Sequence, residues 1–155
     1  MSRIGAVVVC AIVIVLNVAC SLEPSDERPG FGLSGEVNQQ AVEDWSFTSD
    51  AHDVSIETTT SYFIPHSVTV WVVTLGNQLY VSADEPDGKS WVANVARDPN
   101  VRFKFGDKIY EQKLVVVTDA KTMASIDTAF AKKYDYEEEE FEDVEAAYWH
   151  VVERD

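Results

Sequence analysis

The stretch SVTVWVVTLGNQLYVSA, residues 67–83, decides the fold class. Its first half, Ser67–Thr74, consists almost entirely of β-branched and aromatic residues, which favour a strand. Gly76 and Asn77 then supply turn residues, and Gln78–Ala83 returns with further strand-forming residues. Two strand signals joined by so short a turn predict a β-hairpin.

Other segments on both sides of this hairpin also have strand signals. Apolar and polar residues alternate in Asp53–Thr60 and in Asn100–Phe105, which is the period of a half-buried strand. Gly106 and Asp107 form a turn that leads into Ile109–Thr118, so a second hairpin is expected there. The apolar tail Ala146–Val152 is predicted to be either a helical turn or a closing strand.

Two helices are predicted among these strands. Asp119 is placed to cap a helix over Lys121–Tyr134, with apolar residues on one stripe at helical spacing (Met123, Ile126, Ala129, Phe130 and Tyr134). Ser90 is predicted to cap a shorter helix over Trp91–Arg97. Frequent turns without long βαβ alternation predict a mainly β fold: a small closed barrel of six antiparallel strands with two or three short helices.

The N-terminus has the pattern of an export signal. Arg3 precedes thirteen uncharged, mostly apolar residues, fewer than the roughly 18 wanted for a membrane-spanning helix. Ala19 directly before Cys20 resembles the lipobox of bacterial lipoproteins, whose cysteine is acylated and becomes the first mature residue. This predicts a signal peptide over 1–19 and a lipid anchor on Cys20. The alternatives are an ordinary signal cut near Ala19, or an N-terminal anchor that stays attached.

Residues 20–35 are expected to be a flexible tether, and 36–155 the single folded domain. The segment SLEPSDERPGFGLSG, residues 21–35, is rich in Pro and Gly and has almost no periodic apolar signal. The expected location is therefore the bacterial cell envelope, with the domain held at the periplasmic or extracellular face of a membrane. With Cys10 in the leader and Cys20 acylated, no disulfide is expected.

Charge restricts the partners. The chain has 12 Lys and Arg residues against 27 Asp and Glu, a net charge of −15, which repels nucleic acid. Nine of the 12 basic residues lie between Lys89 and Lys133, so one part of the chain could still hold a small anion. The acidic run from Glu137 to Glu145 is interpreted as a solvated face. The three histidines have no ligand spacing for zinc, and no metal is expected.

The segment DGKSWVANVARDPNVRF, residues 87–103, is the candidate ligand site. A helix N-terminus attracts anions, and Lys89 adds a full positive charge there. Trp91 and Val95 form the expected buried face, while Asn94 and Arg97 lie three apart on a neighbouring face. The structural alternative is that Gly88 shapes a turn, Lys89 is solvated and Trp91 belongs to the core.

The order of these motifs resembles a known superfamily. V-x-V-W-V-V at 68–73, G-x-x-L-Y-V at 76–81 and K-x-W-x-x-N-x-x-x-D-P-x-V at 89–101 look like the flavin-binding split β-barrels. These are the pyridoxamine 5′-phosphate oxidase-like proteins, including their deazaflavin-dependent nitroreductase-like branch. The resemblance covers about Asp44 to Lys133. It implies a six-stranded split barrel, usually a homodimer, with FMN or a deazaflavin in a groove at the subunit interface.

The resemblance also implies which residues bind the cofactor. The strand with Val70, Val72 and Thr74 would line the ring pocket. Lys89, Ser90 and Trp91 would approach the phosphate, and Asn94 and Arg97 match positions on the short helix that follows. Lys89 and Arg97 would supply all the positive charge that binds the cofactor phosphate.

Hydride transfer would be performed by the cofactor, with the protein supplying orientation and electrostatics. The first hypothesis is a membrane-tethered oxidoreductase. The alternatives on the same barrel are a protein that holds haem, flavin or another anion without turnover, and an envelope interaction module without cofactor.

Overall fold

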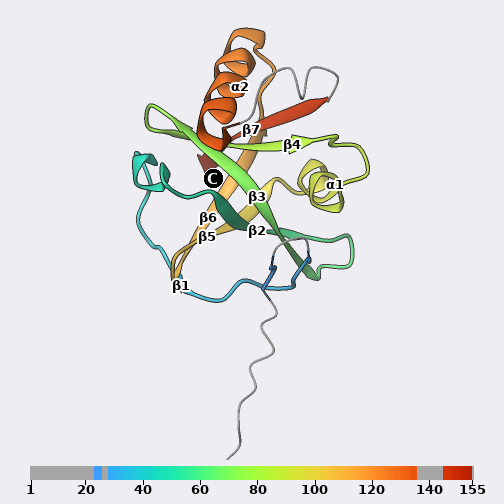
Figure 1. Ribbon diagram of the computed structural model, residues 1–155. Helices are drawn as coiled ribbons and strands as arrows, with labels where there is room; N and C mark the ends of the chain where they lie inside the picture. The colour runs from blue at the N-terminus through green and yellow to red at the C-terminus, as the bar shows by residue number, and fades with distance from the viewer. Residues whose placement is uncertain (1–22, 26–27, 136–144, 155) are drawn as a thin grey trace, which may run out of the picture.

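The computed structural model describes residues 23–25, 28–135 and 145–154 (Figure 1). The leader, Cys20 and most of the acidic run lie outside these residues. The elements follow in the order β1 (Glu36–Val37), η1 (Ser46–Thr48), β2 (Asp53–Thr59), β3 (Pro65–Leu75), β4 (Gln78–Asp84), α1 (Ser90–Arg97), β5 (Asn100–Phe105), β6 (Lys108–Val116), α2 (Ala120–Tyr134) and β7 (Ala146–Glu153).

Six antiparallel strands close into a barrel. The sheet order is β1-β6-β5-β2-β3-β4-β7, and a further pairing of β6 with β7 joins the two sides. The predicted six-stranded barrel is therefore confirmed, and the tail is the closing strand rather than a helical turn. The short strand β1 is an addition outside the barrel that pairs with β6 in parallel.

Side chains alternate between the barrel interior and its outer face. On β4, Leu79, Val81 and Ala83 are buried in the main core, while Tyr80, Ser82 and Asp84 point outward. The pairs Val72↔Val81 and Val73↔Tyr80 fix the same alternation on β3, so its even-numbered residues face inward. Closure of the barrel thus buries one face of every strand and leaves the other for helices or ligands.

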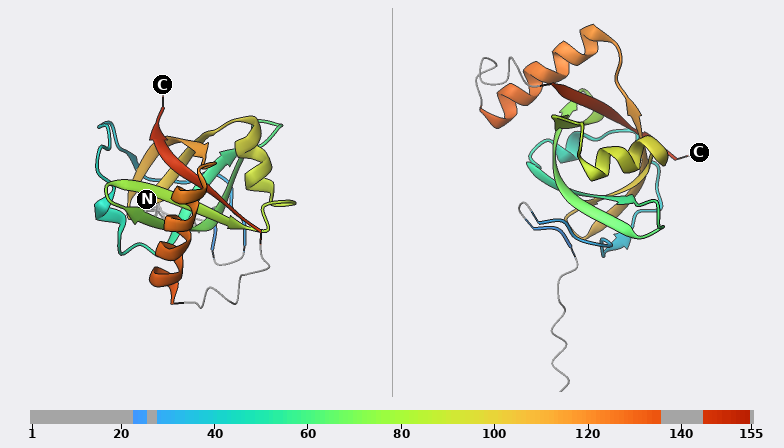
Figure 2. Two further views of the ribbon diagram at one scale, coloured as in Figure 1. Left: turned by 90° about the horizontal axis from the view of Figure 1, so that it is seen from above. Right: turned by 90° about the vertical axis from the view of Figure 1, so that its right-hand side faces the viewer.

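Helix α2 covers part of the outer face. Ile126 and Phe130 are buried against Val73 of β3 and Tyr148 of β7, in a second core cluster. Asp119 caps the helix as predicted, because its carboxylate accepts a hydrogen bond from the Thr122 amide at 2.8 Å. Figure 2 shows α2 at the end of the barrel opposite the N-terminal segment.

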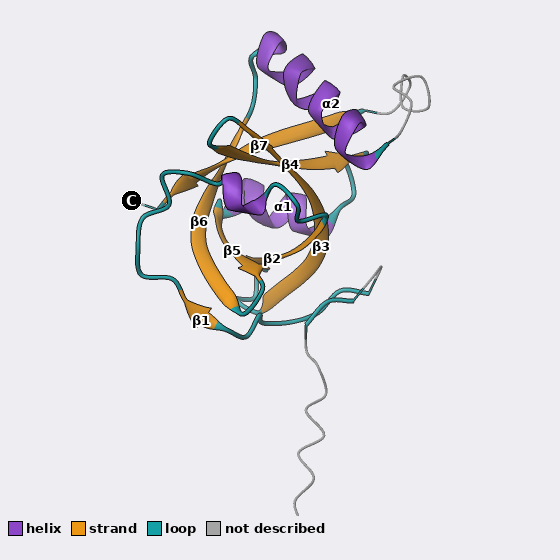
Figure 3. Ribbon diagram, turned by 60° about the vertical axis from the view of Figure 1, so that its left-hand side comes forward, coloured by secondary structure: helices purple, strands orange, loops and turns teal. Residues whose placement is uncertain are grey.

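Helix α1 packs across one opening of the barrel (Figure 3). Trp91 and Val95 are buried in the main core, as their spacing predicts, and the Trp91 ring lies 5.2 Å from that of Trp149. The predicted cap is wrong by one residue. Lys89, with extended backbone, is the N-cap, and Ser90 is the first helical residue. No side-chain hydrogen bond caps this end of the helix, so its start depends on the packing of Trp91.

The described part of residues 20–35 lies along the barrel. Gly30 exchanges two backbone hydrogen bonds with Ser67, and Leu33 is buried. The Leu33 amide donates to the Glu57 carboxylate at 2.6 Å, and Glu57 also pairs with Arg102. The Pro- and Gly-rich composition predicted a tether without order, because such a segment has little apolar surface of its own. Here the polar outer face of β2 and β5 supplies the missing contacts.

No helix among the described residues is long and apolar enough to cross a membrane.

Candidate functional site

A pocket opens where strands β3 and β4 separate. Their pairing runs from Leu75↔Gln78 to Val72↔Val81. The residues that would continue this register, Thr69–Trp71 and Ser82–Asp84, instead line a hollow of about 210 Å³ together with Lys89 and Trp91. We call this hollow the split pocket. It lies beside the start of α1, since Lys89 is the N-cap of that helix.

The split pocket combines one cation with an aromatic wall and hydroxyl groups. Lys89 is exposed at its rim. Trp71 is 37% exposed and stacks on Tyr134 of α2, with ring centroids 4.3 Å apart and planes within 11°. Thr69 and Ser82 are half-buried on the outer face of their strands. A planar ring and a phosphate can both find partners here, because aromatic rings stack and the ammonium group attracts an anion.

Asp84 adds a titratable group to the split pocket. Burial raises the pKa of its carboxyl above the ordinary value, and Asp127 and Glu85 add to the increase, whereas Lys89 opposes it. Asp127 is itself fixed on α2 by a 2.8 Å hydrogen bond from the Tyr148 hydroxyl. Asp84 therefore keeps its proton to a higher pH than a solvated aspartate.

Two backbone groups of β3 are bound by α2 next to the pocket. Pairing of β2 with β3 ends at Asp53↔Trp71. Just beyond it, the Val72 amide donates to the Tyr134 hydroxyl at 3.0 Å, and the Val72 carbonyl accepts from the Lys133 ammonium at 2.8 Å. Burial lowers the pKa of Lys133. These contacts fix Trp71 and Tyr134 as one rigid wall.

Three of the residues singled out from the sequence meet in the split pocket: Val70, Lys89 and Trp91. Ser90 is exposed on the first turn of α1, directly after Lys89. Val72 and Thr74 face the interior instead. Val72 is fully buried in the main core, and the Thr74 hydroxyl lies 3.1 Å from that of Thr48. Neither is among the residues that line the split pocket.

Asn94 and Arg97 form a set of hydrogen bonds toward the C-terminal end of α1. The buried Asn94 amide donates to the Thr58 hydroxyl at 3.0 Å and accepts from the Arg97 guanidinium at 3.0 Å. Arg97 also donates to the Thr59 carbonyl at 2.7 Å. An eight-residue helix is roughly 12 Å long, so Arg97 lies a helix length from Lys89, and it is not among the residues that line the split pocket. These contacts tie α1 to β2.

The sequence did not single out Thr69, Trp71, Ser82 and Asp84, which line the outer face of the split pocket. The run Ser67–Thr74 is β-branched and aromatic at almost every position, so its composition does not say which residues face outward. The polar residues Ser82 and Asp84, two apart after a strand signal, were the available indication of the outer face of β4.

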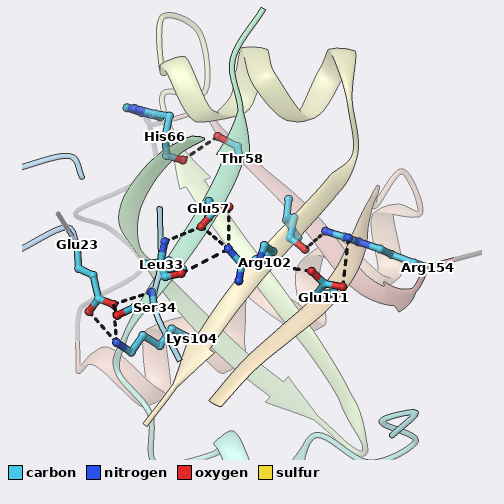
Figure 4. A network of polar contacts seen from close by, with 11 residues as sticks. Glu23, Leu33, Ser34, Glu57, Thr58, His66, Arg102, Lys104, Glu111 and Arg154 are labelled. Carbon is cyan, nitrogen blue, oxygen red and sulfur yellow. Dashed lines mark hydrogen bonds and ion pairs between the residues drawn. The ribbon is translucent and has the colours of Figure 1, made fainter. Parts of the chain in front are cut away.

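Two larger hollows lie elsewhere on the described residues. One, of about 510 Å³, is lined by Glu57, Thr59, Asp98, Asn100, Val101, Arg102 and Arg154. Its arginines are already bound: Arg102 pairs with Glu57 (Figure 4), and Arg154 donates to the carbonyls of Gln112 and Val101. The other, of about 350 Å³, includes Lys104, which pairs with Glu23 at 2.7 Å. The Arg and Lys side chains that line these two hollows already have partners within the protein, whereas Lys89 is exposed at the rim of the split pocket.

Among the described residues, no group of three or more His, Cys, Asp or Glu side chains could hold a metal ion.

The closed six-stranded barrel, parted between β3 and β4 and covered by two helices, defines a split β-barrel protein. Residues 46–148, more than half of the chain, match the family described as "Uncharacterized protein conserved in bacteria (DUF2255)". The chain belongs to this family. Among curated proteins, no significant match is found.

Two solved structures share the fold. The conserved hypothetical protein Rv2991 from Mycobacterium tuberculosis aligns with a TM-score of 0.58 at 15% identity, over 77% of this chain and 86% of that one. A "putative 5-nitroimidazole antibiotic resistance protein" from Bacteroides thetaiotaomicron aligns with a TM-score of 0.52 at 14% identity, over 82% and 88%. Both likenesses agree with the barrel fold described above. At these identities they establish the fold alone.

Proposed function

We propose that this protein binds FMN or a deazaflavin cofactor in the split pocket and acts as an oxidoreductase on a small organic substrate. The observation that carries this proposal is the separation of β3 from β4 beside Lys89. It gives a flat aromatic surface, hydroxyl groups and one cation on the outer face of a barrel whose interior is filled.

The residues present fit such a cofactor in kind. Lys89 and the uncapped start of α1 would hold the phosphate, because that end of the helix carries a partial positive charge. Trp71 would stack on the ring system, held in place by Tyr134. Thr69 and Ser82 would donate or accept hydrogen bonds at the ring edge. The cofactor supplies hydride chemistry, and the protein excludes water from the stacked face and orients the ring.

A single chain supplies only part of the site. The split pocket holds about 210 Å³, whereas ligand sites usually enclose about 300–1,000 Å³. A second copy of the chain that faces this opening would complete the enclosure. We therefore propose a homodimer with the cofactor at the interface, as the resemblance implies.

We further propose that the domain works at a membrane of the bacterial envelope. The support is the sequence pattern that ends in Ala19-Cys20, with a lipid on Cys20 as the anchor. The proposed enzyme would then obtain its cofactor after export, because the leader has one Arg rather than a twin-Arg pair.

The test is titration of the purified protein with FMN and, separately, with a deazaflavin cofactor, followed by visible absorbance and tryptophan fluorescence. Binding of either cofactor with quenching of tryptophan emission is expected, since Trp71 would lie against the ring. Reduction of the bound cofactor by a nicotinamide or other hydride donor, with transfer to a nitroaromatic probe, would establish turnover. Failure of both cofactors to bind at millimolar concentration would reject the site, whereas binding without turnover would leave a carrier.

A further inference from the structure

The turn between β2 and β3 exposes an aromatic tip. Tyr62 is 82% exposed, Phe63 is 88% exposed, and Ile64 and Pro65 are also exposed. We call Ser61–Pro65 the aromatic tip. Three large apolar side chains in succession at the end of a hairpin are unusual on a protein surface. Such exposed apolar runs usually mark a site of interaction.

The conformation of the aromatic tip is fixed by hydrogen bonds. Phe63 has φ of 61°, in the left-handed region that Asn or Gly would adopt with less strain. The Phe63 amide donates to the Thr60 carbonyl, and the Ile64 amide donates to the Thr60 hydroxyl at 3.1 Å. The turn therefore keeps the Phe63 backbone in this less favourable conformation, with the phenyl ring exposed to solvent.

The N-terminal segment passes beside the tip. A Cβ placed on Gly32 would lie 3.9 Å from Pro65 Cβ, and Phe31, the residue before Gly32, is also exposed. The Arg97 guanidinium donates to the Thr59 carbonyl near the end of β2, and its side chain is exposed. Exposed aromatic side chains match the interface of a bilayer, where rings lie at headgroup level.

The N-terminal segment links the barrel to the proposed lipid anchor. Glu23 binds Lys104 at 2.7 Å, and this contact lowers the pKa of the Glu23 carboxyl to about 2, so the ion pair persists at neutral pH. Cys20 precedes Glu23 by three residues, which span at most roughly 11 Å. Gly30 is then bound to Ser67, two residues beyond Pro65. A lipid on Cys20 would therefore leave the barrel little freedom to move away from the bilayer.

From these contacts we propose that the aromatic tip is a second membrane contact, which inserts into the interface of a phospholipid bilayer. This rests on the proposed attachment through Cys20. A single acyl chain gives only marginal binding, and a second contact strengthens it. The tip would also orient the barrel, with α2 directed away from the bilayer, since α2 lies at the end opposite the N-terminal segment (Figure 2).

The test attaches the protein to lipid by a chemical link at Cys20, in place of the proposed acylation. The chain from Cys20 to Asp155 contains every described strand and helix and both core clusters, and Cys20 is then its single cysteine. We would couple it to maleimide-bearing lipid in vesicles of phosphatidylcholine and phosphatidylglycerol, and measure amide hydrogen exchange. Because the link is artificial, the result depends neither on acylation in cells nor on cofactor binding, which mass spectrometry of the native N-terminus and the titrations above would test separately.

Exchange in the peptide covering residues 60–66 is expected to slow severalfold on tethering, while exchange in α2 stays unchanged. Phe63→Asn should abolish most of this protection without loss of folding, because Asn tolerates the left-handed backbone. Lys121→Ala, on α2, is the matched control and should leave the protection intact. Equal exchange of residues 60–66 in the tethered and free protein would overturn the proposal. So would protection that depends on protein density instead of lipid, which would indicate contact between two copies.

Discussion

The two ends of helix α1 differ although both were expected to bind the same phosphate. At its start, Lys89 is exposed beside the split pocket, and no side chain caps the helix. At its end, Asn94 is buried and bound to Thr58, and Arg97 is bound to Asn94 and Thr59. The start is available to a ligand, whereas the end is engaged in holding the helix on the barrel.

This difference shows that polar residues on one short helix can serve separate purposes. A buried amide with two partners stabilises the fold because removing it leaves those partners without hydrogen bonds. An exposed ammonium contributes little to stability but can bind an anion. Substitutions at the two ends should therefore affect different measurements.

Asn94→Ala is expected to have the largest effect. It leaves the Thr58 hydroxyl and Arg97 without their buried partner, which costs about 2 kcal/mol of the free energy of unfolding. Urea denaturation followed by tryptophan fluorescence would measure the loss. Wild-type stability in this variant would show that Asn94 does not hold α1, and that the contrast between the two ends is wrong.

Lys89→Ala should weaken binding of FMN or the deazaflavin about tenfold, because the phosphate loses a charged hydrogen-bond donor. The free energy of unfolding should stay within about 0.5 kcal/mol of wild type, as is usual for an exposed side chain. Cofactor titration and urea denaturation measure the two quantities. Lys121→Ala provides a control for the loss of one positive charge, and an equal loss of affinity there would point to a general charge effect.

Arg97→Ala should show the opposite pattern. Loss of its hydrogen bonds to Asn94 and Thr59 should lower the free energy of unfolding by about 1 kcal/mol. Cofactor affinity, measured well below the denaturation midpoint, should not change. If affinity falls as it does for Lys89→Ala, the phosphate is bound between the two ends, as the sequence first indicated.

Asp84 gives the smallest effect, visible as a dependence on pH. Its pKa in the folded state is raised by burial above the unfolded value, so the folded state holds the proton more tightly. The free energy of unfolding should therefore gain from Asp84 as the pH falls through this raised pKa, and lose that gain as the pH rises through it. Asp84→Asn should remove this component from a series of denaturation curves. Parallel pH profiles for wild type and variant would contradict the assignment.

Local patterns predicted much of the fold. The hairpin over residues 67–83, the strand Asn100–Phe105 and the helix capped by Asp119 were each readable from neighbouring residues. The start of α1 was misplaced by one residue because Ser90 has the preferred chemistry for an N-cap, yet burial of Trp91 sets where the helix begins. Residues 28–35 resembled a tether because their partners, Ser67 and Glu57, are distant in sequence.

The site was predicted less completely than the fold. Lys89, Trp91 and Val70 were identified and do meet. Val72 and Thr74 lie on β3 but do not line the split pocket, and a run of strand-forming residues without clear alternation does not fix which side is outward. Trp71 and Asp84 entered the site only through the register of β3 against β4.

The sequence by itself determined that the chain forms a mainly β barrel, that Lys89 precedes a short helix anchored by Trp91, and that the protein is strongly acidic, because these properties depend on composition and on contacts between near neighbours. Only the tertiary structure decided that β3 and β4 part beside Lys89, that Arg97 belongs to the fold rather than to the pocket, and that the aromatic tip is held out in solvent. Those features depend on pairing between residues far apart in the chain, and one residue of register exchanges the inner and outer faces of a strand.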